Sequence, residues 1–128
     1  MYYPMVIKYI QASHLLAMTN MVRDYTPQLL ELIAGRFKIL AEPMRLRILS
    51  ALRAGEKTVT ELVEETGAGQ ANVSKHLGLL HRNRLVERRK DGLNVYYCIT
   101  DEGIFRLCDL VCGSLEREVE ERRRALRS

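Results

Sequence analysis

Cysteine is scarce in this chain of 128 residues, which contains only Cys98, Cys108 and Cys112. Three is an odd number, whereas a small protein held together by disulfides normally carries an even set. We therefore expect no disulfide framework. Unpaired cysteines suit a reducing compartment, so the expected location is the cytoplasm.

The chain also lacks a long uninterrupted hydrophobic run near its start. Lys8, Gln11, His14 and Asn20 break the apolar stretch, and no basic segment precedes it. A signal peptide needs a basic start followed by an apolar run, and a membrane helix needs about 20 apolar residues. We expect neither feature here, and no membrane partner.

Motifs typical of enzymes are missing as well. Gly67-Ala68-Gly69 lacks the rest of a glycine-rich phosphate loop. No histidine or cysteine is placed to activate a nucleophile, and acidic pairs such as Glu64-Glu65 fall at helical positions expected to face solvent. The sequence therefore predicts that the protein is not an enzyme.

The positive charge, in contrast, is concentrated in one segment. The net charge is only +4, but six basic residues and one acidic residue, Glu87, lie between Lys75 and Lys90. Such a cluster creates the local potential that attracts a polyanion, although a solvated charged face is the simpler alternative. The hydrophobic content of 47% can supply a core, and it is modest enough to be compatible with a dimer.

Helical periodicity dominates the first half of the chain. Apolar residues form helical stripes over residues 5–24, and Thr26-Pro27 is typical of an N-cap followed by the first helical residue. A further helix is expected from Glu42-Pro43 to about Gly55. The residues predicted to face inward in these last two helices are Leu30, Ile33, Phe37 and Leu40, then Leu46, Leu49 and Leu52 or Ile48.

Two short helices and a hairpin follow. Thr58 and Glu61 fit a capping box for a helix ending at Thr66, and a glycine turn leads to a second helix over about residues 70–83. Strands over 85–90 and 93–99 are joined at Asp91-Gly92, which is a strong hairpin signal. Thr100 is expected to cap a last long helix. This order predicts a mainly α fold with a β-hairpin wing, the winged helix-turn-helix.

The second of the short helices has the dimensions to enter the major groove of DNA. At about 100° per residue, Val73, Leu77 and Leu80 share one face, which we expect to be buried. The candidate DNA contacts on the remaining surface are Gln70, Ala71, Asn72, Ser74, Lys75, His76 and Arg82.

These candidates have different expected roles. Lys75 can reach guanine O6 or N7, and Ala71 can touch a thymine methyl group. Asn72 and Ser74 can bond base edges or phosphate, and Gln70 and Arg82 are expected at phosphates. His76 lies at the edge of the buried face, so packing is its first interpretation and a base contact the alternative. Gly78, opposite the buried face, leaves room for a close approach to the backbone.

The predicted wing adds Arg88, Arg89 and Lys90 as candidate DNA contacts. Because side chains alternate along a strand, Arg88 and Lys90 share one face and Arg89 lies on the other. The three side chains therefore cannot all touch DNA at the same time. Phosphate contacts from the wing would add affinity and little sequence information.

The chain resembles the ArsR family of bacterial dimeric winged-helix repressors over roughly residues 34–112. The matching segments are LAEPMRLRIL at 40–49, VSKHL at 73–77 with Leu80, Leu85-Val86, and Gly92 with Val95-Tyr96-Tyr97. The resemblance implies a homodimer on an imperfect palindromic operator, released by an inducer. It also implies dimerisation through the first and last helices, with residues 1–33 as an N-terminal extension and 34–128 as the DNA-binding domain with its C-terminal dimerisation helix.

Two inducer sites of this family are not supported by the residues present. No histidine follows His81, so a zinc site on the last helix is not expected. The short helix expected to end at Thr66 has no cysteine, so a cysteine site there is not expected either. Cys108 and Cys112 remain, one helical turn apart. A soft ion could join their sulfurs, with a third ligand from Cys98, the partner subunit or solvent. The resemblance suggests trivalent arsenic or antimony, whereas buried core cysteines and a thiol redox switch are the alternatives.

The sequence therefore predicts a dimeric DNA-binding repressor that responds to a ligand, with double-stranded operator DNA as its partner. A thiol redox-sensing repressor is one alternative. A winged-helix module that binds only proteins is the other, and its affinity for DNA would lack the steep salt dependence of a repressor.

Overall fold

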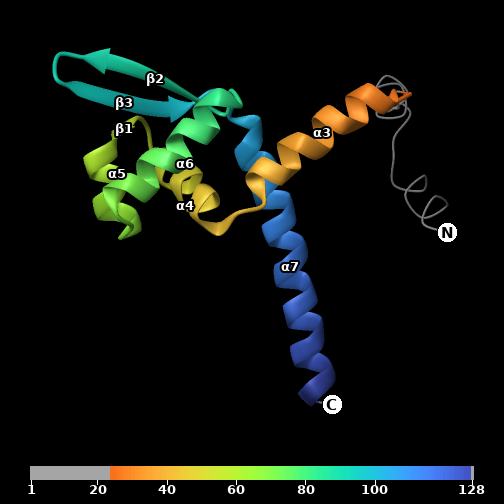
Figure 1. The fold of residues 1–128 in the computed structure, drawn as a ribbon. Coiled ribbons are helices and arrows are strands. Elements are labelled where there is room, and N and C mark those ends of the chain that lie inside the picture. Colours follow the sequence, from red (N-terminus) through yellow and green to blue (C-terminus); the bar gives the residue numbers. More distant parts are fainter. Residues whose placement is uncertain (1–23, 128) are drawn as a thin grey trace, which may run out of the picture. The chain divides into compact units, whose positions relative to one another are not determined.

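A computed structural model describes residues 24–127, and the helix expected within residues 5–24 lies almost entirely outside them. Helix α3 spans Pro27–Leu40, and the chain divides into two compact units within it, between Gly35 and Arg36. The other elements, in order, are α4 (Pro43–Leu52), β1 (Lys57–Thr58), α5 (Val59–Thr66), α6 (Gln70–Arg82), β2 (Val86–Asp91), β3 (Asn94–Ile99) and α7 (Gly103–Arg127) (Figure 1). This is the predicted winged helix-turn-helix.

The start of α3 agrees with the sequence, but its predicted buried face does not. The N–H of Leu29 donates to Oγ1 of Thr26 at 3.1 Å, as an N-cap requires. Leu40 is buried, whereas Leu30 is 50% exposed and Phe37 is 52% exposed. The prediction that these two are buried was wrong for the single chain, because helical spacing identifies an apolar face and not the surface that covers it.

Helix α4 begins as predicted at Glu42-Pro43. The Glu42 carboxylate accepts the backbone N–H of Arg45 at 2.9 Å, and this bond holds the pKa of Glu42 below its ordinary value. Leu49, Leu52 and Ile48 are buried, but Leu46 is 40% exposed, so its predicted inward position was wrong. Ile48 is buried instead of Leu46, because Ile48 lies on the side of α4 that packs against α5 and α6.

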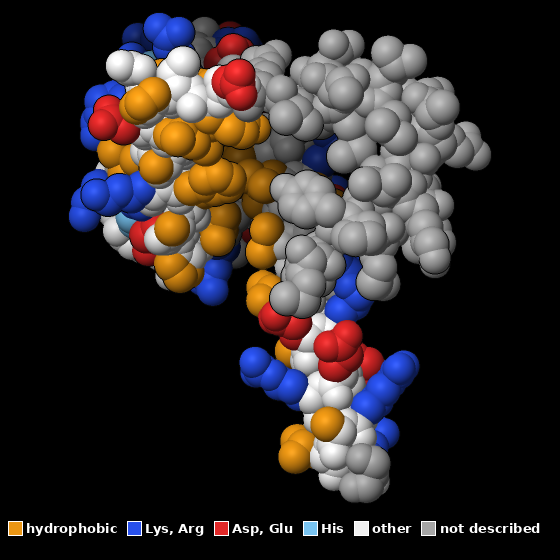
Figure 2. Space-filling model, turned by 90° about the vertical axis from the view of Figure 1, so that its right-hand side faces the viewer, with side chains coloured by type: hydrophobic (Ala, Val, Ile, Leu, Met, Phe, Trp, Pro, Cys, Tyr) orange, Lys and Arg blue, Asp and Glu red, His pale blue; other side chains and the backbone are white. Residues whose placement is uncertain are grey.

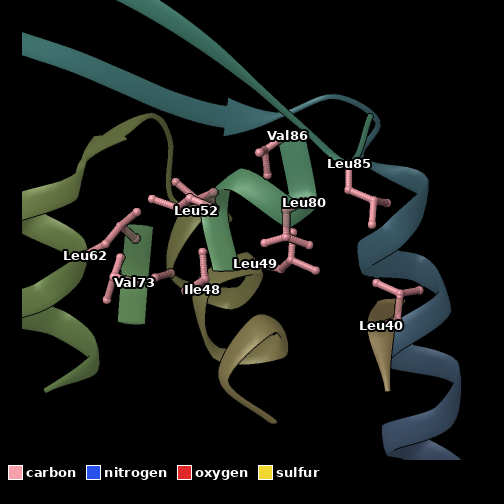
Figure 3. Packing of buried hydrophobic residues seen from close by; sticks show 11 residues of the cluster. Leu40, Ile48, Leu49, Leu52, Leu62, Val73, Leu80, Leu85 and Val86 are labelled. Atoms are coloured by element: carbon pink, nitrogen blue, oxygen red, sulfur yellow. The ribbon is translucent and has the colours of Figure 1, made fainter. Parts of the chain in front are cut away.

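The core lies where α4, α5 and α6 meet. Val73, Leu77 and Leu80 of α6 are fully buried, as predicted from their spacing, together with Leu62 of α5. Figure 3 shows Leu80 beside Leu49 of α4, and Leu62 beside Val73. The burial of its apolar face fixes the rotation of α6 about its own axis, and with it the side that faces solvent.

The joint between α5 and α6 also follows the sequence. Oγ1 of Thr58 accepts the N–H of Glu61, and the Glu61 carboxylate accepts the N–H of Thr58, both at 3.2 Å. This capping box begins α5. Gly67 ends it in the left-handed conformation, with φ of 71°. A residue without Cβ is favoured there, so the glycine directs the chain into the turn before α6.

The sheet differs from the prediction in two respects. It has three strands in the order β1-β3-β2, because the two-residue strand β1, which the sequence did not reveal, pairs with Tyr96 and Tyr97. Asp91 pairs with Asn94, so the central turn residues are Gly92 and Leu93, one position later than predicted. Gly92 has φ of 61°, and glycine at the first central position is typical of a type II′ turn.

Helix α7 begins later than predicted. Oδ1 of Asp101 accepts the N–H of Gly103 at 2.8 Å, whereas the N–H of Thr100 donates to the Leu85 carbonyl at 3.2 Å. The prediction that Thr100 caps α7 was therefore wrong, because the backbone of Thr100 is still hydrogen-bonded to Leu85 at the edge of the core. Near the other end of α7, Nε of Arg124 lies 3.5 Å from Oε1 of Glu120, one helical turn before it.

A two-pronged ion pair joins α7 to the end of α4. The Arg53 guanidinium donates to both carboxylate oxygens of Asp109 at 2.8 Å and lies 5.0 Å above the Phe105 ring. These hydrogen bonds raise the pKa of Arg53 and lower that of Asp109. Both groups therefore stay charged at neutral pH, and α7 is tied to α4 beside Cys108.

In the part of the chain that the structure describes, no helix combines the length and apolarity needed to cross a membrane.

Replacing Leu80 by alanine should destabilise the fold strongly. Leu80 is fully buried at the centre of the core. Truncation of such a leucine leaves a cavity and lowers the free energy of unfolding by about 2–5 kcal/mol. Urea denaturation followed by circular dichroism measures this change. Leu93→Ala is the matched control, because Leu93 is fully exposed in the hairpin turn and its loss should change stability by less than about 0.5 kcal/mol. Equal effects of the two substitutions would contradict this assignment of the core.

Candidate nucleic-acid interface

The outer face of α6 is the candidate recognition surface. Its inner face is held by the core, and six of the seven predicted contact residues on this helix are exposed. They are Gln70, Ala71, Asn72, Ser74, Lys75 and Arg82. Helix α6 contains no aspartate or glutamate along its whole length. An exposed helix with small, polar and basic residues and no negative charge matches the chemistry of base edges and phosphates.

The first turn of α6 leaves its backbone donors open to an external group. Gly69 is the N-cap, and no side-chain hydrogen bond caps this end, unlike the ends that Thr58 and Glu42 cap. Free N–H groups at a helix N-terminus, with the positive end of the helix dipole, favour an anion. This geometry fits the predicted phosphate role of Gln70, the first residue of α6.

His76 is the exception among the predicted contacts, because it is buried, with 8% exposure. Its Nδ1 lies 3.4 Å from Nη1 of Arg45, whose Nε donates to the Ile39 carbonyl. Arg45 thereby connects α6 to the last turn of α3. A side chain held in this way cannot reach a base edge. The structure therefore favours the packing role for His76, and we remove it from the set of candidate DNA contacts.

Gly78 has a local explanation that the sequence did not suggest. A Cβ added to Gly78 would lie 3.5 Å from Nη1 of Arg82, so the Arg82 side chain lies back over this glycine. Gly113 and Arg117 show the same arrangement on α7, outside the candidate interface. A glycine one turn before an arginine is therefore no specific sign of a DNA-reading face.

The strand register places the basic side chains of the wing on two faces, as predicted. Arg88 is paired with Tyr97 and Lys90 with Val95, whereas Arg89 is paired with Tyr96. Paired residues of an antiparallel ladder share a face, so Arg88 and Lys90 lie opposite Arg89. Among the described residues, neither Arg88 nor Lys90 has an ion-pair partner.

Arg89, in contrast, is engaged within the protein. Its guanidinium donates to both carboxylate oxygens of Glu56, lies 3.5 Å from the Asp91 carboxylate, and stacks 4.7 Å from the centre of the Tyr96 ring. The hydrogen bond between Arg89 and Glu56 lowers the pKa of Glu56 and raises that of Arg89, so both groups are charged at neutral pH. The sequence could not reveal Glu56 as a wing residue, because it lies 33 positions before Arg89.

The three cysteines differ in their surroundings. Cys98 lies in β3 and is half-buried, as is Cys108, whereas Cys112 is exposed. Sγ of Cys112 donates to Oε1 of Glu116 at 3.3 Å, and this hydrogen bond, with the nearby carboxylate charge, raises the pKa of the thiol. Within residues 24–127 no three histidine, cysteine or acidic side chains converge as a metal site, so Cys98 does not complete a set with Cys108 and Cys112 in one subunit.

Cys108 and Cys112 lie along an apolar groove of about 740 Å³ between α7, the end of α3 and the start of α4. The groove is lined mainly by hydrophobic side chains, among them Phe37, Leu46, Val111, Leu115 and Val119. The last three are 51–60% exposed. Figure 2 shows hydrophobic side chains gathered over one face of the described residues, with lysine and arginine at its edges. An exposed apolar surface of this kind normally marks an interaction site.

Comparison with known proteins identifies the family. The model of the family described as bacterial regulatory protein, arsR family, matches residues 42–88. A transcriptional repressor SmtB homolog from Synechocystis is 35% identical over 100 residues, which cover 74% of this chain and 76% of that protein.

Two solved structures extend the comparison. The homodimeric winged helix-turn-helix DNA-binding domain of a possible ArsR-family regulator from Mycobacterium bovis has a TM-score of 0.67 and 34% identity, covering 77% of this chain and 92% of that one. The AntR antimony-specific transcriptional repressor also has a TM-score of 0.67, with 30% identity, covering 78% of this chain and 94% of that one. The chain therefore belongs to the ArsR family of bacterial regulatory proteins, which control transcription by binding DNA.

Proposed function

We propose that this protein is a homodimeric repressor that places α6 of each subunit in the major groove of a palindromic operator and leaves the DNA when a thiophilic ligand binds. The observation that carries the proposal is the division of α6 into two faces. Its apolar face is completely buried, and its exposed face is polar and basic with no acidic residue. Two such helices about 34–36 Å apart would contact two half-sites on one side of the duplex.

The proposed contacts combine base reading with phosphate binding. Lys75 reads guanine, Ala71 touches a thymine methyl group, and Asn72 and Ser74 bond base edges or phosphate. Gln70 contacts phosphate at the open N-terminus of α6. Arg82 from the end of α6 adds a further phosphate contact, and the wing adds others through Arg88 and Lys90 on one face or Arg89 on the opposite face. These contacts raise affinity for every sequence.

We propose that the dimer forms through α7 together with the N-terminal extension, residues 1–33, leaving residues 34–128 as the DNA-binding domain. The exposed apolar side chains of α7 and the groove beside them support this proposal. The similar Mycobacterium bovis domain is homodimeric. Burial of these side chains against a second subunit would remove this exposed apolar face from water.

For the inducer, we propose a trivalent antimony or arsenic species bound through Cys108 and Cys112. Both thiols line the same groove, and a similar protein is an antimony-specific repressor. Cys112 is exposed in the single chain, so it is not a core cysteine within one subunit. A third ligand would come from the partner subunit or solvent.

Lys75→Ala should reduce recognition of the operator. If Lys75 makes a two-pronged contact to guanine, its loss should weaken specific binding by about 1–3 kcal/mol and change non-specific binding much less. Fluorescence anisotropy with operator and scrambled duplexes measures both affinities. Lys38→Ala, which removes an exposed lysine from α3, is the control and should keep the wild-type preference. An unchanged operator preference in Lys75→Ala would reject base reading by Lys75. A wild-type protein that binds no duplex in a salt-dependent way would instead support the protein-binding module.

Glu56→Gln should strengthen DNA binding without regard to sequence. The substitution removes the carboxylate that engages Arg89, which frees the guanidinium for a phosphate. Affinity should rise for operator and random duplex alike, and the slope of log affinity against log salt should steepen by up to about 0.9 per subunit. Glu118→Gln, which removes an exposed carboxylate from α7, is the control. Weaker binding by Glu56→Gln would show that the ion pair positions the wing and would contradict a phosphate contact by Arg89.

Cys108→Ser and Cys112→Ser should each leave operator binding intact and prevent release by antimonite or arsenite. Serine keeps the shape of the side chain but removes the soft sulfur ligand. Anisotropy titrations of the preformed complex with antimonite, arsenite, zinc and peroxide separate the possible inducers. Cys98→Ser is the matched control and should remain inducible. A double Cys108→Ser, Cys112→Ser variant that is still fully released would exclude this site.

A further inference from the structure

Arg84 has an unusual backbone conformation. It is the only residue other than glycine with positive φ among residues 24–127, and its φ of 59° lies in the left-handed region. Gly55, Gly67 and Gly92 occupy the other positive-φ positions in this part of the chain. A side chain with a Cβ is strained in this region, so glycine is normally favoured and asparagine is tolerated.

The fold requires this conformation at the end of α6. The N–H of Leu85 donates to the Leu80 carbonyl at 2.9 Å, and the N–H of Arg84 donates to the His81 carbonyl at 3.0 Å. These two bonds are the pattern of a Schellman motif, which places its left-handed residue at position 84. Leu85 and Val86 then enter the core directly, with 5% and 1% exposure. The chain therefore has no freedom to relax the backbone of Arg84.

The arginine side chain contributes nothing visible to the fold. It is exposed, and its guanidinium forms no hydrogen bond, ion pair or ring contact with the described residues. Arg45, Arg53 and Arg89 show the contrast, because each is bonded to another element. Glycine would be the less strained residue at this position, so an explanation for the long basic side chain has to be sought outside the described part of the chain.

The place of Arg84 supplies that explanation. It lies between Arg82, at the end of α6, and the first residues of β2, so it connects the two elements proposed to touch DNA. We propose that Arg84 is a phosphate contact of the bound duplex, held at the helix–wing junction in spite of its backbone strain. A phosphate is the appropriate target because base reading is concentrated near the N-terminal part of a recognition helix. This inference rests on the proposed function.

Arg84→Gly separates stability from binding, because the two should change in opposite directions. Relief of the backbone strain should raise the melting temperature by roughly 2–8 °C. Loss of a charged phosphate contact should weaken binding to operator and random duplex alike by about tenfold. The slope of log affinity against log salt should fall by about 0.9 per subunit. Calorimetry and anisotropy on the full chain measure these three quantities.

Three further variants complete the test. Arg84→Lys keeps both the charge and the strain, so it should match the wild-type melting temperature and bind within about threefold, because lysine also binds phosphate as a point charge. Arg84→Asn tolerates the left-handed conformation without the charge, so it should weaken binding as Arg84→Gly does and replaces that variant if it fails to fold. Arg127→Gln removes one positive charge at the end of α7 and should leave the salt slope unchanged.

The outcomes that overturn the proposal are distinct from failure of the proposed function. Wild-type affinity in Arg84→Gly or Arg84→Asn would overturn the phosphate contact while leaving a DNA-binding repressor in place. Equal loss of binding in Arg84→Lys and Arg84→Gly would show that charge is not the cause, which also overturns it. A wild-type protein without salt-dependent DNA binding would reject the proposed function itself, and this assignment with it.

Discussion

The burial of one face of α6 is the constraint on which the rest of the structure depends. Val73, Leu77 and Leu80 are completely removed from water against α4 and α5, so the helix cannot rotate without exposing three large side chains. Full burial of each is worth about 1.5–3 kcal/mol. The direction of Lys75 and Ala71 is therefore decided by the core and not by the exposed residues themselves. The wing depends on the same contact, because Leu85 and Val86 join this core immediately after α6.

The basic residues have to be divided according to what each charge contacts. Arg45 joins the end of α3 to His76, Arg53 joins α4 to α7, and Arg89 is bound to Glu56. These guanidiniums stabilise or orient parts of the fold, and their full charge is not available to a second anion. Lys75, Arg84, Arg88 and Lys90 have no such partner in the described part of the chain. A count of basic residues in the sequence therefore overestimates the charge that can meet DNA, and the positions without partners define the interface more narrowly.

Local rules predicted the elements well, whereas contacts between distant residues were missed. The Thr26 cap, the Glu42-Pro43 start and the Thr58–Glu61 capping box depend on neighbours within one turn, and all are present. The two-residue strand β1 exists only because β3 lies beside it, and the wing contact of Glu56 spans 33 positions. The predictions that Leu30, Phe37 and Leu46 are buried failed because an apolar stripe does not reveal whether its own chain or another surface covers it.

Arg84 illustrates a further limit of sequence patterns. Its sequence neighbours predict a basic segment, and nothing in the residue type reveals that the backbone there is left-handed. The information comes from the hydrogen bonds of Leu85 and Arg84 to the last turn of α6, together with the immediate burial of Leu85. A strained residue inside a core would be explained by its packing, but this side chain is exposed. Strain without packing, at an exposed side chain between two elements proposed to touch DNA, therefore directs attention to what the residue meets outside its own chain.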